Sequence, residues 1–318
     1  MAAGDRPARE DADPAGGVEP RPPAERPLGA PFDGYAEEPL PQAAPGTVGK
    51  AGVFEARFQR QGPRTRLVRD HARVPFHSTG ALDHDDAVAT VFLQTPTGGL
   101  AQGDRHRVDI EVGPDARAHV TGQAATKVLG MERNYGRVDV SLSVGAGGYL
   151  EYVPDPTILQ AGSRCLVRTD AALAGDATLV VGDVLVPGRL ARGERFAFDR
   201  YRSRTVARGP EGRLFEDAAD MGDDDPRRPG LLGDSTVVGS LYAVTPGADA
   251  RDLADAVHER AAGCEGVKAG ASTLPGDVGV FLRALGERSR PVEGALRAAR
   301  DEIRRAAIGA GVGPRRKM

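Results

Sequence analysis

The sequence lacks tryptophan altogether, and it holds only two cysteines, Cys165 and Cys264. Two cysteines cannot build a disulfide framework, and they cannot close a four-ligand zinc site by themselves. No stretch approaches the roughly 18 consecutive apolar residues that a membrane span needs, which argues against an integral membrane protein. The net charge is -3, so no global basic field marks a nucleic-acid-binding protein. Composition therefore excludes the disulfide-rich, membrane and nucleic-acid-binding classes.

Glycine and proline are abundant, with 42 and 24 residues among 318, and their distribution is uneven. Residues 1–47 contain ten of the prolines and carry a net charge of -5, and their large apolar side chains are few. Such a segment buries too little apolar surface to offset the entropy of ordering it. We therefore expect an acidic, proline-rich disordered extension over 1–47. A partner-binding arm is the alternative interpretation, and the segment has neither the pattern of a secretory signal nor that of a transit peptide.

From about residue 50 onward the hydrophobic pattern has a period of two, which is typical of half-buried strands. The clearest example covers 137–144, where apolar residues occupy every second position. Other strands are predicted near 54–58, 65–70, 87–94, 107–112, 116–121, 148–153, 164–169, 177–186, 194–208 and 234–245. Short glycine and proline turns separate them, and the turn at Gly145–Gly148 reads as a hairpin, so we expect antiparallel pairing. The pattern predicts a mainly β, multi-stranded body over 48–248 and argues against a doubly wound parallel sheet.

The pattern changes over 249–318, where it predicts a small α+β part in the order helix, strand, strand, helix. The helices are expected at 249–262 and 291–308, and the strands near 266–272 and 277–285. In the second helix the apolar stripe comprises Val292, Leu296, Ala299 and Ile303. The arginines off this stripe are expected to form a solvated basic face, or a surface for an acidic partner: Arg297, Arg300, Arg304 and Arg305.

Nucleotide and metal motifs are absent from the sequence in recognisable form. Gly46–Lys50 ends in Gly-Lys but lacks the Ser or Thr and the glycine spacing of a phosphate loop. His71, His77 and His84 lie near several aspartates, but their spacing matches no compact metal-ligand motif. The acidic run over 216–225 does not follow the order of a calcium loop. Hydrated loops are the favoured interpretation of both acidic stretches.

One pair of residues has a catalytic interpretation. A glycine-rich turn presents Asp104 at the head of a strand, and His106 lies two residues further, hence on the same strand face. A carboxylate beside an imidazole is the orienting pair of general-base chemistry. No nucleophile is marked by the sequence, and a turn glycine with a capping aspartate is a common structural feature.

Four blocks, taken in order, resemble the urease accessory protein family UreD, also called UreH. The first is a Gly-Gly-x-x-x-Gly-Asp turn at Gly98–Asp104, and the second is a Thr-x-Gln-Ala-Ala-Thr-Lys segment at Thr121–Lys127. The third, Leu-Glu-Tyr-Val-Pro, lies at Leu150–Pro154, and the fourth, Gly-Arg-x-Ala-x-Gly-Glu-x-Phe, lies at Gly188–Phe196. Each block alone is weak, but the resemblance extends from about residue 50 to about 310.

The resemblance implies a non-enzymatic scaffold with a stacked, β-helix-like arrangement of strands and a small helical part. Such proteins bind the urease apoprotein and the partner UreF, which recruits the GTPase UreG, and the assembly helps to insert nickel into the urease active site. The resemblance also implies a cytoplasmic location, no tightly bound cofactor, nickel only in transit and GTP bound by UreG rather than by this chain.

The resemblance further implies residues that line a transient nickel channel. Asp104 and Thr126 match the family pattern directly, and Glu216 matches it less closely. Separate carboxylates and hydroxyls hold a hydrated dication weakly and release it, whereas several histidines would trap nickel. On this basis Asp104→Ala is expected to leave folding and partner binding intact and to lower urease activation.

Two other classes of function stay open at this point. One is a small-molecule hydrolase that uses Asp104 and His106, and the other is a β-rich structural or adhesion protein. A coding neighbourhood that contains urease subunits would discriminate among the three classes.

Overall fold

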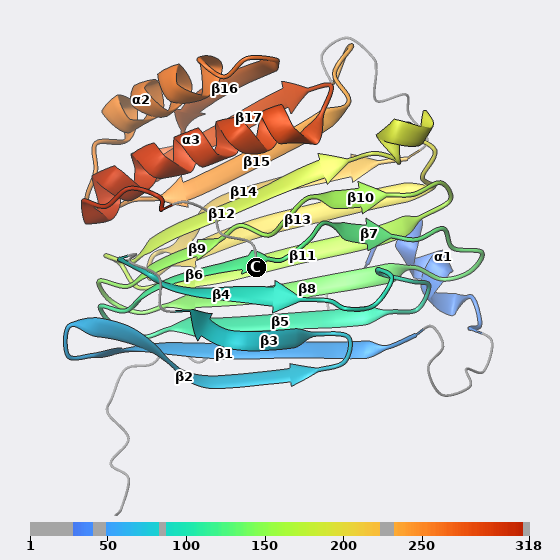
Figure 1. Cartoon of the computed structure of the whole chain (residues 1–318), viewed down its shortest axis with the longest axis horizontal. Helices are drawn as coiled ribbons and strands as arrows, with labels where there is room; N and C mark the ends of the chain where they lie inside the picture. Colours follow the sequence, from blue (N-terminus) through green and yellow to red (C-terminus); the bar gives the residue numbers. More distant parts are fainter. Residues whose placement is uncertain (1–27, 41–48, 83–86, 223–231, 314–318) are drawn as a thin grey trace, which may run out of the picture.

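Two stacked β-sheets form the body of the protein, and the two C-terminal helices lie together on one outer face (Figure 1). The computed structural model describes residues 28–40, 49–82, 87–222 and 232–313, and about half of the chain lies in strands. The seven-stranded sheet has the order β14 (Gly212–Met221), β13 (Arg200–Gly209), β11 (Arg164–Leu173), β8 (Gly136–Val144), β5 (Arg105–Val112), β1 (Ala51–Gln61) and β2 (Arg64–Arg73).

The second sheet has ten strands and continues into the C-terminal part of the chain. Its main order is β16 (Val267–Thr273), β17 (Gly279–Gly286), β15 (Val237–Val244), β12 (Thr178–Val186), β9 (Tyr149–Tyr152), β6 (Arg117–Gly122), β4 (Ala89–Gln94) and β3 (His77–Leu82). Two short strands, β7 (Thr126–Val128) and β10 (Thr157–Leu159), pair with each other, and β10 also pairs with β12.

Successive strands of the body alternate between the two sheets, so the chain winds as a coil. β5, β8, β11 and β13 lie in the seven-stranded sheet, and β6, β9 and β12 follow them in the other sheet. Strands one coil apart pair in parallel, as β5 does with β8 and β6 does with β9. The mainly β, β-helix-like architecture is thereby confirmed.

The antiparallel pairing expected for the body is wrong for its central strands. The short glycine turns join strands of opposite sheets, so each strand meets its sheet neighbour only one coil later and in the same direction. The Gly145–Gly148 turn, for example, links β8 to β9 across the two sheets and closes no hairpin. Antiparallel pairs occur toward the sheet edges, between β1 and β2, β13 and β14, β3 and β4, β12 and β15, β15 and β17, and β16 and β17.

The period-two pattern places one face of each strand in the core between the sheets. In β8 the side chains of Val140, Leu142 and Val144 are 2–3% exposed and join one large apolar cluster. Asp139 lies on the opposite face, where it forms an ion pair with Arg137 at 2.7 Å. Burial of the apolar face is the main favourable contribution to folding of such a sandwich.

The C-terminal part has the predicted order of elements. α2 (Ala250–Ala262) precedes β16 and β17, and α3 (Ser289–Ile308) follows them. The side chain of Asp249 caps α2 by accepting hydrogen bonds from two backbone N–H groups of the first turn. Both helices pack on the ten-stranded sheet, over β15, β16 and β17 (Figure 1), and bury the predicted stripe of α3. The two strands extend the sheet of the body.

Part of the expected N-terminal extension is folded onto the body. Residues 28–40 contain a short helix, α1 (Phe32–Glu37), and Phe32 is fully buried against Tyr135 and Leu166. Arg202 donates hydrogen bonds to the backbone carbonyls of residues 28 and 30, at 2.7 and 2.6 Å. Disorder is therefore the wrong expectation for 28–40, because arginines of the sheet bind this segment in addition to its few apolar contacts. Residues 1–27 and 41–47 lie outside the described residues.

Candidate functional site

Asp104 lies in the turn before β5 and is 3% exposed. Its carboxylate accepts hydrogen bonds from the backbone N–H groups of Ala101 (2.9 Å), Gly49 (3.0 Å) and Lys50 (2.8 Å). The side chain thereby ties the start of β1 to the start of β5, its parallel neighbour. These three donors occupy both carboxylate oxygens, so Asp104 acts as a clamp at this end of the body.

His106 shares the interior face of β5, as the strand spacing predicts. It is 6% exposed, and its ring packs edge-on against Phe76, with 5.0 Å between ring centroids. Its Nε2 lies 3.9 Å from Oδ2 of Asp104, which is too long for a hydrogen bond. Burial lowers the pKa of His106, although Asp104 opposes this effect, so the imidazole is neutral at pH 7. The distance does not support the orienting pair of a general base.

The first two sequence blocks lie directly against each other. Gly99 has φ +142°, and a Cβ atom at this position would lie 2.2 Å from the backbone oxygen of Lys127. The backbone N–H of Leu100 donates to that same oxygen at 2.7 Å, and the N–H of Leu129 donates to Leu100 at 2.9 Å. Only glycine fits this close approach, which explains Gly99 in the first block.

The third block leads into the strand that lies beside the second. The N–H of Thr126 donates to the carbonyl of Pro156 at 2.9 Å, and β7 pairs in parallel with β10 through Thr126 and Thr157. Thr157 also lies opposite Leu185 at the end of β12. The end of β12 leads into the fourth block, so the first, second and fourth blocks meet here with the strand that follows the third.

The fourth block closes this region with a turn that is largely exposed. The Glu194 carboxylate accepts a hydrogen bond from the N–H of Ala161 at 3.0 Å and pairs with Arg189. Gly188 has φ +143°, and a Cβ there would lie 2.2 Å from the backbone oxygen of Glu194. We call residues 98–104, 126–128, 157–161 and 188–194 the motif surface. Among its exposed members are Lys127 and Arg192.

Glu151, the acid of the third block, points away from the motif surface toward α3. It is fully buried and accepts a hydrogen bond from Nε of Arg304 at 2.8 Å, while Arg300 lies 3.7 Å from its carboxylate. Tyr149 donates its hydroxyl to the same carboxylate, and Arg300 contacts His119 at 2.9 Å. Burial alone would raise the pKa of Glu151, but the arginines outweigh it and hold that pKa at about 2.

The solvated basic face expected on the last helix is wrong for two of its arginines. Arg304 is 0% exposed and Arg300 is 6% exposed. Both lie against Glu151, about 150 residues earlier in the chain, which pairs with Arg304 and attracts Arg300. This group of charges, which we call the helix clasp, fastens α3 to the ten-stranded sheet.

The three residues predicted to line a nickel channel do not lie together. Glu216 is exposed on the outer face of β14, where it pairs with Arg204 at 2.8 Å and with Arg213. The hydrogen bond from Arg204 is the main cause that lowers the pKa of Glu216. Asp104 directly precedes β5, and β5 lies four strand spacings, roughly 19 Å, from β14 in the same sheet. Thr126 is half-buried in β7, which belongs to the other sheet.

Polar side chains instead converge on the inward faces of β12, β14, β15 and β17, where the side chains of Arg283 and Asp217 are 35% and 33% exposed. Asp217 accepts a hydrogen bond from the hydroxyl of Tyr242 at 2.7 Å and lies 3.5 Å from Arg283. Arg283 donates to the hydroxyl of Ser240 at 2.9 Å, and Ser240 lies opposite Asp183 in the strand register. We call these five residues the interior polar layer.

Asp183 differs from the other acids because its pKa is raised, to about 6. Burial is the largest cause, and the nearby Asp217 adds to it, while Arg283 and Ser240 act in the opposite direction. The side chain is therefore partly protonated near neutral pH and holds its negative charge weakly. A carboxylate of this kind can accept a cation or a proton without a large reorganisation of its surroundings.

Sequence reasoning missed the interior polar layer. A signal existed for Asp183, since a single acid lies in the otherwise apolar run 179–186. No such signal existed for β14. Leu214 and Phe215 are both apolar, so the alternation of the sequence does not show which of Glu216 and Asp217 points into the core. The strand register resolves it, because Ala207 and Phe215 are paired and buried, which places Asp217 on the interior face and Glu216 outside.

Within the described ranges, no group of three or more His, Cys, Asp or Glu side chains is arranged to hold a metal ion. Of the predicted acidic stretches, residues 83–86 and 223–225 lie outside those ranges. Asp220 forms an ion pair with Arg200 at 2.7 Å and with Arg202 at 2.6 Å. Neither cysteine forms a disulfide.

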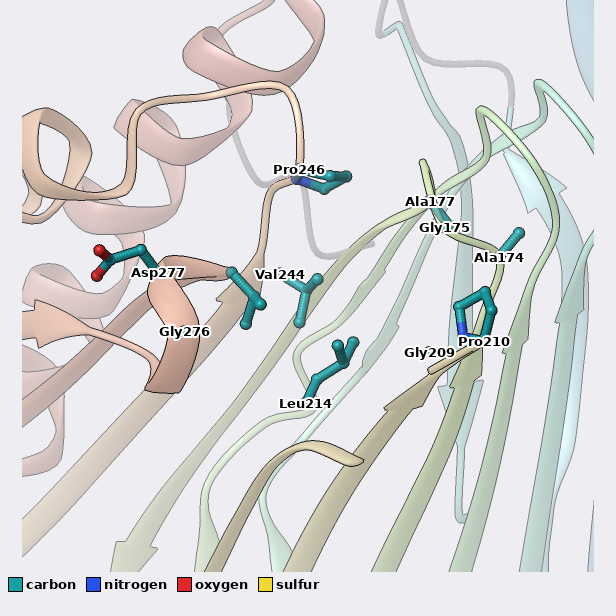
Figure 2. A pocket seen from close by; sticks show the side chains of 11 residues that line it. Ala174, Gly175, Ala177, Gly209, Pro210, Leu214, Val244, Pro246, Gly276 and Asp277 are labelled. Atoms are coloured by element: carbon teal, nitrogen blue, oxygen red, sulfur yellow. The ribbon is translucent and has the colours of Figure 1, made fainter. Parts of the chain in front are cut away.

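A depression of about 270 Å³ opens at the opposite end of the body from the motif surface (Figure 2). Turns that follow β11, β13 and β15 form its wall, together with the loop before β17. Its lining is largely apolar, with Pro210, Leu214, Val244 and Pro246 among its side chains. The carboxylate of Asp277 points away from the other labelled side chains in Figure 2, so no set of polar groups converges there.

Comparison with known proteins gives a consistent result across the chain. Residues 50–317 match the family model described as UreD urease accessory protein. Urease accessory protein UreD of Haloarcula marismortui is 53% identical over 277 residues, which cover 86% of this chain and 92% of that protein. The protein of the same name from Natronomonas pharaonis is 47% identical, over 88% and 96% of the two chains. Urease accessory protein UreD 2 of Streptomyces griseus is 38% identical, over 84% and 93%.

Proposed function

Because this chain belongs to the UreD family of urease accessory proteins, we propose that it is a non-catalytic scaffold in urease maturation. In this proposal it binds the urease apoprotein and UreF, and UreF recruits the GTPase UreG. GTP binds to UreG, which agrees with the lack of a phosphate-loop pattern in the sequence. The proposed location is the cytoplasm, and no helix in the described part of the chain is long and apolar enough to cross a membrane.

The observation that carries the scaffold proposal is the motif surface, where three of the four family blocks meet together with the strand that follows the third block. Their glycines permit close backbone contacts, and their acids, Asp104 and Glu194, bind backbone N–H groups. The blocks therefore build a rigid surface at one end of a long body. A rigid surface without a convergent polar pocket is suited to docking a protein.

Nickel is the proposed cargo of the assembly, held by this chain only in transit. Asp104, Thr126 and Glu216 are the residues that the family resemblance suggests, and we now propose different roles for the two acids. Asp104 positions the motif surface, and Glu216 neutralises arginines on the outer face. Asp183 and Asp217 are better placed for transient contact with a hydrated dication, because they are oxygen ligands in the interior and hold no fixed metal cage.

The docking proposal is tested by copurification from cells that express the urease operon, with this chain tagged. We expect urease apoprotein and UreF to copurify without added nucleotide. The variant Lys127→Glu with Arg192→Glu changes two exposed charges of the motif surface and is expected to weaken recovery of at least one partner. The matched control is Arg288→Glu with Arg290→Glu, which makes the same change in net charge at exposed positions at the start of α3.

Equal recovery of both partners with the two double variants would remove the motif surface from the docking proposal. Failure of the unmodified chain to recover either partner would contradict the scaffold proposal itself.

A further inference from the structure

The outward face of β2, the edge strand of the seven-stranded sheet, carries a row of basic side chains. On β1 the residues Phe54, Ala56 and Phe58 are buried in the core, so the alternate residues point outward. Residues paired across two strands share a face. The β1–β2 register therefore gives the outward residues of β2, which we call the basic row: Arg64, Arg66, Arg69, His71 and Arg73.

Acidic side chains neutralise only part of the basic row. Arg69 pairs with Glu55 at 3.0 Å, but Glu55 also binds Arg107 at 3.0 Å. Arg64 and Arg73 are exposed and form no ion pair with any described residue. The one acid within β2, Asp70, lies opposite Ala56 and so belongs to the other face. An excess of positive charge is thus presented along one line.

Apolar side chains are exposed beside the same row. Among the described residues only three large hydrophobic side chains are exposed, and two of them belong to this region. Val68 is 39% exposed at the irregularity where the register shifts, and Val74 is 65% exposed directly after β2. Exposed apolar groups next to unneutralised charge are the combination that a protein partner buries.

The backbone of β2 also has an open side. Within the described part of the sheet, β2 has a single hydrogen-bonded neighbour, β1, and it forms the lower margin of the body in Figure 1. An open edge offers N–H and C=O groups to an added strand.

The opposite edge of the same sheet, β14, also has a single neighbour among the described strands, but it differs in its charge and in its exposed apolar side chains. On β14 the outward residues Glu216 and Asp220 are acidic, and arginines of the neighbouring β13 neutralise them. None of the exposed large hydrophobic side chains of the described chain lies on β14. The unneutralised charge of β2 is therefore a local property, since the other edge of the sheet balances its charges.

We propose that the β2 edge is a docking site for an acidic, extended segment of a partner protein. Carboxylates at alternate positions of the segment face the basic row, and the apolar residues close to them contact Val68 and Val74. The segment adds to the sheet along β2 by backbone hydrogen bonds. This inference is independent of the motif surface, which lies at one end of the strands.

The test uses the full chain and a fluorescein-labelled synthetic peptide of alternating glutamate and valine. Fluorescence anisotropy is expected to show saturable binding that weakens roughly tenfold between about 0.05 M and about 0.3 M salt, because salt screens exposed charges. The same peptide with glutamine in place of glutamate is expected not to bind.

Two variants locate the site. Arg64→Glu with Arg73→Glu is expected to weaken peptide binding at least about tenfold, whereas Arg288→Glu with Arg290→Glu changes it less than about twofold. Val68→Ser with Val74→Ser is expected to weaken binding and to leave its salt dependence unchanged. Unfolding midpoints equal to that of the unmodified chain show that a variant is folded.

Three results would overturn the proposal. The first is the absence of saturable binding, and the second is an equal loss in the two charge-reversed variants, which would indicate attraction by net charge alone. The third is self-association of the unmodified chain in sedimentation analysis that Arg64→Glu with Arg73→Glu abolishes. That result would make a second copy of this chain the occupant of the edge.

Discussion

The ten-stranded sheet carries one acid on each face, Glu151 fully buried and Asp183 partly buried, and the two acids have opposite properties. Glu151, on the helix face, has a pKa held at about 2, because Arg300 and Arg304 surround it. Asp183, on the interior face, has a pKa raised to about 6, because it is buried with a shared arginine and a second acid. The negative charge of Glu151 is fully compensated by the arginines, and this residue stabilises the fold. The second is incompletely compensated, which costs stability and is the usual condition of a functional group.

The largest effect is expected from Glu151→Gln. The substitution leaves two arginines without their acid in a dry site, so we expect a loss of about 3–5 kcal/mol in the free energy of unfolding. Urea denaturation measures it. The control is Glu216→Gln, which breaks only exposed ion pairs and is expected to cost less than about 1 kcal/mol. Equal losses would show that the helix clasp is not compensated as described.

The contribution of the helix clasp to the free energy of unfolding is expected to fall at acidic pH. The pKa of Glu151 is lower in the folded chain than its ordinary value of 4.5, so its contribution to stability is present above pH 4.5. That contribution is lost as the pH falls from about 4.5 toward 2. Unfolding measured across this range should show the loss in the unmodified chain and a smaller loss in Glu151→Gln. Parallel profiles would contradict the assignment.

Asp183→Asn is expected to act in the opposite direction. Because the folded pKa of Asp183 is raised from 3.8 to about 6, its contribution to stability is present below pH 3.8 and lost as the pH rises through 6. Removing the charge should raise the free energy of unfolding by roughly 2–3 kcal/mol at pH 7.5 and by much less at pH 4. Destabilisation at pH 7.5 would mean that the charge of Asp183 is fully compensated.

Asp104→Asn is expected to have the smallest of these effects on stability. Asparagine keeps one acceptor oxygen, and the lost hydrogen bonds come from backbone N–H groups at the starts of two strands. We expect a loss of about 1–3 kcal/mol in the free energy of unfolding, measured by urea denaturation. This replaces the expectation that a substitution at Asp104 leaves folding intact. No change in stability would show that Asp104 is not a clamp.

Strand positions could be predicted from the sequence, and strand partners could not. The alternation at 137–144 identifies β8, because one face of that strand is buried and the other is charged. Alternation contains no information on which strand lies next to it, so the parallel pairing of β8 with β5 and β11 was missed. Short glycine turns have the same composition whether they close a hairpin or join two sheets.

The candidate site, too, could be predicted from the sequence only in part. The four blocks identify the family, and their glycines could be assigned to turns. The convergence of three of them on the motif surface depends on coils that bring Lys127 beside Gly99 and Ala161 beside Glu194. Arg304 was expected to be solvated because its partner, Glu151, is far away in the sequence. Glu216 was assigned to the channel by the family resemblance alone, and the two adjacent apolar residues before it left open which face of β14 it occupies.

The most direct test of the account measures urease activity at limiting nickel in cells whose own copy of this gene is deleted. The unmodified chain and Glu216→Gln should both restore activity, while Asp183→Asn should restore much less, even though it makes the fold more stable. Stability gained together with activation lost in this one variant would identify the interior polar layer as functional. Full activation by Asp183→Asn would contradict the proposed passage of nickel through the interior, and no activation by the unmodified chain would contradict a role in urease maturation.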